Sequence, residues 1–102
     1  MRKRCYITLG AATDAGGKVV TASSSVSLDG VRRALEGDLV DCPNCGSKGE
    51  IACDGRRLAC SEDGRRPALE DDLCLCKCKP TPRLLASQQR YRQWLADRSE
   101  AA

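Results

Sequence analysis

The chain has 102 residues, with 8 Cys, no His, no Phe and only 3% aromatic residues. This length fits one domain with a thin hydrophobic core, and a domain of that kind usually needs disulfides or a metal to hold it together. The net charge of +3 belongs to the chain ends, because residues 13–78 hold 9 Lys and Arg against 12 Asp and Glu. A mildly acidic body argues against a nucleic-acid-binding surface.

The beginning of the chain does not look like a secretory signal. It is basic, but residues 5–10 are too short and too polar for the apolar core of such a signal, and no stretch approaches a transmembrane span. We therefore expect a protein that starts in the cytoplasm without a signal peptide and does not insert stably into a membrane. Thiols stay reduced there, so closely spaced Cys indicate a metal more often than a disulfide.

Short β-strands separated by turns are predicted from residue 5 to residue 73. Residues 23–28 alternate small polar with apolar side chains, and Asp29 with Gly30 then forms a two-residue hairpin turn. The same dipeptide follows at Asp63 and Gly64. The pattern predicts an all-β body of short hairpins.

Many residues of the first hairpin return 34 positions later. The matching pairs are Asp29 and Asp63, Gly30 and Gly64, Ala34 and Ala68, Leu35 and Leu69, Glu36 and Glu70, Asp38 and Asp72, Leu39 and Leu73, and Cys42 and Cys76. One offset shared by so many positions indicates a repeat architecture. We therefore predict two internal repeats, each ending in cysteines.

The first repeat ends in a metal-binding pattern. Cys42 and Cys45 have the two-residue spacing of a zinc-binding pair, and Gly46 after them allows the backbone to wrap around an ion. Such a pair supplies half of the ligands that a tetrahedral site needs.

The second pair must come from Cys74, Cys76 and Cys78, which alternate and so share one face of a strand. Cys76 occupies the repeat position of Cys42, whereas Cys74 occupies the position of Val40, which looks like core. The prediction is a structural zinc ion held by Cys42, Cys45, Cys76 and Cys78, with Cys74 as the substitute ligand. Iron also takes four thiolates, so the metal stays open.

The other cysteines are expected to be small buried hydrophobic residues. This interpretation is favoured for Cys5, Cys53 and Cys60, while for Cys74 the two interpretations are almost balanced. A thiol oxidoreductase would need a helix beginning at its first cysteine, and the β context here does not supply one. Without His there is no imidazole base, and a closed four-thiolate site is structural, so we expect no enzyme activity.

The character of the chain changes after Cys78. Pro80 and Pro82 cannot continue a strand ladder, so residues 79–82 are predicted to be a linker. Residues 84–102 contain helix formers with apolar side chains at roughly helical spacing. We therefore predict a repeat domain over residues 1–78, followed by the linker and a short C-terminal helix over residues 79–102.

Taken together, these residues resemble the proline-alanine-alanine-arginine (PAAR) repeat proteins, which form the tip on the spike of the bacterial type VI secretion system. The residues that match the family pattern are Thr13, Gly16, Gly17, Gly30, Ala34, Gly37, Asp38, Cys42, Pro43, Gly49, Ile51, Gly64, Ala68, Asp72 and Cys76. The sequence departs from the pattern at Ala15, where the family has a metal-binding His, and at Leu35 and Leu69, where it has Arg.

The resemblance implies a small cone-like body with a metal near its point. Its base would sit on the trimeric valine-glycine repeat (VgrG) spike protein, and contraction of the apparatus would secrete it into the medium or the target cell. The resemblance also implies that the C-terminal tail could carry effector cargo. The alternative is a zinc-ribbon-like module that binds nucleic acid or protein, since the same cysteines would serve it equally well.

Overall fold

The computed structural model describes residues 2–58 and 61–95, and all regular structure in this part is β. The strands are β1 (Arg2–Cys5), β2 (Lys18–Val19), β3 (Ser27–Leu28), β4 (Val31–Arg32), β5 (Leu39–Cys42), β6 (Ser47–Ala52), β7 (Leu73–Leu75) and β8 (Arg92–Leu95). The prediction of an all-β fold built from short strands is confirmed. Nothing in the described part is a helix capable of crossing a membrane.

The predicted C-terminal helix is wrong over the described residues. β8 is an extended strand that pairs antiparallel with β1, from Arg2 opposite Leu95 to Cys5 opposite Arg92. Its side chains alternate, because Gln93 and Leu95 are buried whereas Trp94 is exposed. This period of two suits a half-buried strand. Residues 96–102 of the predicted helix lie outside the described residues.

A ring of paired backbone segments forms the body. The central sheet has the order β2-β5-β6-β7. Three isolated bridges close it into a ring: Leu73 with Arg83, Thr13 with Leu84, and Ala12 with Lys18. The ring consists of three hairpin units, residues 11–20, 39–52 and 73–85, which we call the first, second and third barrel hairpins. Closure of this kind pairs the sheet edges.

Three backbone segments meet in a cyclic set of hydrogen bonds. The N–H of Ile7 donates to the carbonyl of Ala68 at 2.9 Å, Ala68 donates to Ala34 at 3.0 Å, and Ala34 donates back to Ile7 at 2.9 Å. We call this set the backbone triangle. Each of its three sides has the same local pattern, so the body has approximate threefold symmetry.

The same turn follows each corner of the backbone triangle. The turns are closed by the hydrogen bonds Ala11 to Thr8 at 3.0 Å, Asp38 to Leu35 at 3.1 Å and Asp72 to Leu69 at 3.1 Å. Each turn contains a residue with positive φ, at Gly10, Gly37 and Asp71. The 34-residue repeat is therefore present in the backbone geometry, and a third copy precedes it near the N-terminus.

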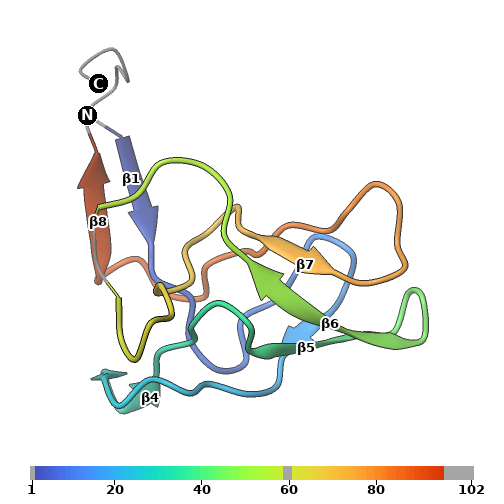
Figure 1. The fold of residues 1–102 in the computed structure, drawn as a ribbon, viewed down its shortest axis with the longest axis horizontal. Coiled ribbons are helices and arrows are strands. Elements are labelled where there is room, and N and C mark those ends of the chain that lie inside the picture. The colour runs from blue at the N-terminus through green and yellow to red at the C-terminus, as the bar shows by residue number, and fades with distance from the viewer. Residues whose placement is uncertain (1, 59–60, 96–102) are drawn as a thin grey trace.

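Three basal hairpins lie on the other side of the triangle. One is β3–β4, with positive φ at both Asp29 and Gly30, and the second has the same turn at Asp63 and Gly64. The third is the antiparallel pair of β1 and β8, whose strands are not consecutive in the chain; we count this pair as the third basal hairpin. Figure 1 shows β1, β8 and β4 at one end of the long axis, and the turn after β5 and the loop after β7 at the other.

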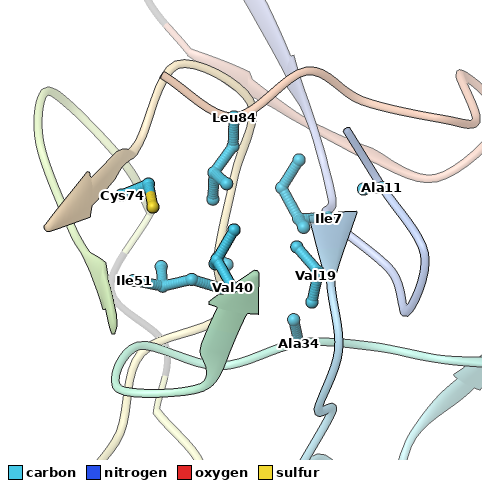
Figure 2. Close-up of a cluster of buried hydrophobic side chains, with 9 residues drawn as sticks. Ile7, Ala11, Val19, Ala34, Val40, Ile51, Cys74 and Leu84 are labelled. Carbon is cyan, nitrogen blue, oxygen red and sulfur yellow. The ribbon is translucent and has the colours of Figure 1, made fainter. Parts of the chain in front are cut away.

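The hydrophobic core fills the barrel. It contains Ile7, Ala11, Val19, Ala34, Val40, Ile51, Ala68, Cys74 and Leu84. In Figure 2, Leu84, Val40 and Ile7 converge from three separate segments. Leu84 is fully buried, so the chain beyond residue 78 contributes to the same core. The division of the chain into domains at residue 78 stays a prediction.

Candidate metal centre

Four cysteines from two barrel hairpins gather at the end of the body opposite the basal hairpins. The second barrel hairpin supplies Cys42 and Cys45, and the third supplies Cys76 and Cys78. Their Sγ atoms all lie within 4.8 Å of one another. These are the four residues that the sequence analysis selected, and the arrangement could hold a metal ion.

Local structure explains how each pair is presented. Cys42 ends β5, and the turn after it is closed by a hydrogen bond from Gly46 N–H to Pro43 O at 3.2 Å. Gly46 has φ of 68°, a left-handed conformation that glycine adopts without strain. The turn therefore brings Cys45 back beside Cys42. On the third hairpin, Cys76 and Cys78 directly follow β7, and the N–H of Cys78 donates to Cys76 Sγ at 3.5 Å.

Two of the sulfur–sulfur distances are close to those of a tetrahedral thiolate site. Cys42 Sγ lies 3.5 Å from Cys78 Sγ and 3.6 Å from Cys76 Sγ. A zinc ion with bonds of about 2.3 Å places its sulfur ligands about 3.8 Å apart. The donor set, which has four soft sulfurs and no oxygen or nitrogen, is typical of closed structural sites.

Three thiols of the cluster have shifted pKa values. The Ser47 hydroxyl is the main cause that lowers the pKa of Cys45 to about 6. Burial raises the pKa of Cys76 to about 11. The Asn44 amide lowers the pKa of Cys78, but burial and the hydrogen bonds with the other thiols outweigh it and raise that pKa to about 12. A divalent cation that displaces these protons would remove the repulsion between thiolates.

The other cysteines that the structure describes lie away from the cluster. Cys74 is in the core cluster, and Gly49 packs so closely on it that an added Cβ would lie 2.6 Å from its sulfur. Cys5 is also buried. Cys53 is half-buried, and burial raises the pKa of its thiol to about 11. Cys60 lies outside the described residues.

The threefold symmetry identifies the residue of the first barrel hairpin that corresponds to the clustered cysteines, which comparison of the two sequence repeats did not reveal. Thr13, Val40 and Cys74 pair with equivalent residues of the neighbouring strands. Two residues further on, Ala15 is therefore the counterpart of Cys42 and Cys76. The first barrel hairpin supplies no sulfur, and the cluster ties together the ends of the other two.

A hollow of about 490 Å³ lies beside the cluster. The residues that line it are Asp14, Ala15, Asn44, Cys78, Lys79 and Pro80. Its lining comes from all three barrel hairpins.

Comparison with known proteins gives one family. The model of the PAAR motif matches residues 9–81, which is most of the chain. No curated protein and no solved structure gives a significant match. The matched range contains two corners of the backbone triangle and all four clustered cysteines. The chain therefore belongs to the PAAR-motif family and is a PAAR-repeat protein of the type VI secretion system.

Proposed function

We propose that this chain caps the trimeric valine-glycine repeat spike of a type VI secretion system as a structural, non-enzymatic tip. Membership of the family fits a spike-tip role in general. The observation that carries the proposal is the backbone triangle of Ile7, Ala34 and Ala68, because one chain with approximate threefold symmetry can match the end of a threefold-symmetric partner. Three basal hairpins surround the triangle, one for each subunit of such a trimer.

The surface of the basal hairpins supports docking at that end. Val31 on β4 and Trp94 on β8 are 41% and 49% exposed, so both apolar side chains are accessible to a partner that docks at this end. Leu75, at the end of β7 near the cysteines, is 53% exposed and serves as a control. Val31→Asp and Trp94→Ser should each weaken capture by the cognate spike trimer, while Leu75→Ser should not. If Leu75→Ser alone abolishes capture, the orientation proposed here is wrong.

We propose zinc as the ion and Cys42, Cys45, Cys76 and Cys78 as its ligands. The ion would tie the second and third barrel hairpins together at the end that leads through a membrane. A thin core gives this end little other support, so the metal would supply stiffness there. Elemental analysis of protein purified under reducing conditions without added metal should find one zinc per chain. Absence of metal would remove this part of the proposal.

The proposed location of the protein before and after secretion follows from its proposed place on the spike. It would wait in the cytoplasm on the loaded apparatus and leave with the spike upon contraction. Cargo, where present, would attach through the C-terminal segment that follows β8. Detection of the chain in the medium of cells with a functional sheath, and not in that of sheath-deficient cells, tests this.

The alternative of a nucleic-acid-binding zinc ribbon has less support. A phosphate-binding surface needs free cations, whereas several arginines here already face carboxylates. The ion pairs are Arg33 with Glu62, Arg57 with Asp72, Arg65 with Asp38, and Arg66 with Glu36. Tight and salt-sensitive binding of duplex or single-stranded DNA in a shift assay would favour the alternative.

A further inference from the structure

Asn44 reaches from one barrel hairpin to the other at the thiol cluster. It lies in the turn between Cys42 and Cys45, on the second hairpin. Its Nδ2 donates a hydrogen bond to Sγ of Cys78 on the third hairpin at 3.3 Å. The same Sγ lies 3.5 Å from that of Cys42. The Asn44 amide therefore contacts the sulfur of Cys78, which is the last of the four clustered cysteines in the chain and belongs to the other hairpin.

A donor in this place acts on a metal-bound sulfur in two ways. It fixes the direction of the sulfur, and it shares the negative charge that four thiolates bring to one ion. Outer hydrogen-bond partners of this kind typically change metal affinity by 10- to 100-fold. Asn44 is exposed and lines the hollow together with Cys78, so water competes for the same contact. The expected effect is therefore at the lower end of that range.

Cys45 has a comparable partner, but within its own hairpin. Ser47 Oγ lies 3.0 Å from Cys45 Sγ. Ser47 begins β6 and pairs directly with Cys42, so strand pairing fixes it in place. Cys78 has no such strand around it, because it lies in the loop after β7. The contact from Asn44 consequently matters more for the placement of Cys78.

We propose that Asn44 is a positioning residue of the metal centre, which holds the Cys78 sulfur by an N–H donor from the neighbouring hairpin. The inference rests on the metal site proposed above. Asn44 does not bind the ion itself. It presets the distance between the two hairpin ends, so that the fourth ligand is in place when the ion arrives.

The test compares Asn44→Asp, which keeps the shape and replaces the donor with a carboxylate, with the parent chain. Asn44→Ala removes the contact, and Lys48→Gln changes an exposed residue of the same hairpin as a control. Three quantities are measured for each: zinc affinity by competition with a chromogenic chelator, the sulfur-to-cobalt charge-transfer absorption of the cobalt-loaded protein, and thermal unfolding of the reduced, metal-free protein.

Asn44→Asp should lower zinc affinity about tenfold or more and shift the charge-transfer band, with the metal-free unfolding temperature unchanged. Asn44→Ala should show a smaller loss, and Lys48→Gln should match the parent. Unchanged affinity and spectrum in Asn44→Asp would overturn the inference. So would a loss of affinity matched by an equal loss of metal-free stability, because that indicates a role in folding alone. A parent chain that binds neither ion would instead refute the metal site itself.

Discussion

Asp38 and Asp72 hold the same turn in two copies of the repeat. The carboxylate of Asp38 accepts the N–H of Leu35 at 2.7 Å, and the carboxylate of Asp72 accepts the N–H of Leu69 at 2.8 Å. Each turn leads from the backbone triangle into a barrel hairpin. The two carboxylates are thus part of the joint between the triangle and the barrel.

Their surroundings differ, and this gives the first prediction. Asp72 is fully buried between Arg4 and Arg57, whereas the Asp38 carboxylate pairs with Arg65, which is 36% exposed. Asp72→Asn should cost about 3 to 5 kcal/mol of unfolding free energy, because it leaves buried guanidinium groups without a counter-charge. Asp38→Asn should cost about 1 to 3 kcal/mol. Urea denaturation of the two variants would contradict this if Asp38→Asn proved the more damaging.

The neighbours Leu84 and Leu85 test whether the chain beyond residue 78 belongs to the body. Leu84 is fully buried in the core cluster, while Leu85 is 45% exposed. Leu84→Ala should therefore lower stability by about 2 to 5 kcal/mol, as expected for a core cavity. Leu85→Ala should change it by no more than about 0.5 kcal/mol. Equal, small effects in thermal or urea unfolding would mean that this segment is a dispensable tail.

Glu62 predicts a particular acid sensitivity. The Ser24 hydroxyl, followed by the N–H and hydroxyl of Ser25, lowers the pKa of Glu62 from 4.5 to about 2. A carboxyl with a lowered folded-state pKa contributes stability above pH 4.5 and loses it as the pH falls toward 2. Glu62→Gln should therefore flatten the fall of stability over this pH range. Parallel urea titrations of the parent and the variant, both reduced and metal-free, would show the same slope if the account were wrong.

Removal of single cysteines should separate the cluster from the rest. Cys42→Ser and Cys76→Ser should each release the metal and lower the melting temperature, since a bound ion at a thousandfold excess over its dissociation constant adds about 4 kcal/mol. Cys53→Ser, at a half-buried position outside the cluster, should retain the metal. Metal content and melting temperature of the three variants give the answer. Retention of metal by all three would exclude this cluster as the binding site.

The 34-residue repeat could be recognised in the sequence because side-chain carboxylates stabilise its turns. Asp38 and Asp72 each use a carboxylate to hold the backbone, so the residue type had to recur. In the third copy, Ala11 takes the equivalent position, and only backbone hydrogen bonds keep the turn. A copy specified by backbone geometry leaves almost no residue signature, apart from Gly10 with its positive φ.

The C-terminal strand was missed for a different reason. Residues 84–102 are rich in good helix formers, and intrinsic propensity is a weak guide where tertiary contacts decide. Here β1 pairs with β8, which lies far from it along the chain. Pairing across such a separation has no local signal. The cysteine cluster, by contrast, followed from the local spacing of Cys42 and Cys45 and from the 34-residue repeat, and both can be read directly from the sequence.

Native mass spectrometry of the chain mixed with its cognate spike trimer tests directly whether one chain caps the whole spike. We expect one chain and one zinc ion for each trimer, because a single pseudo-threefold body would occupy the whole end of the spike. Three chains for each trimer would contradict it, since each subunit would then hold its own copy. The absence of any complex under conditions where the trimer stays intact would contradict it as well.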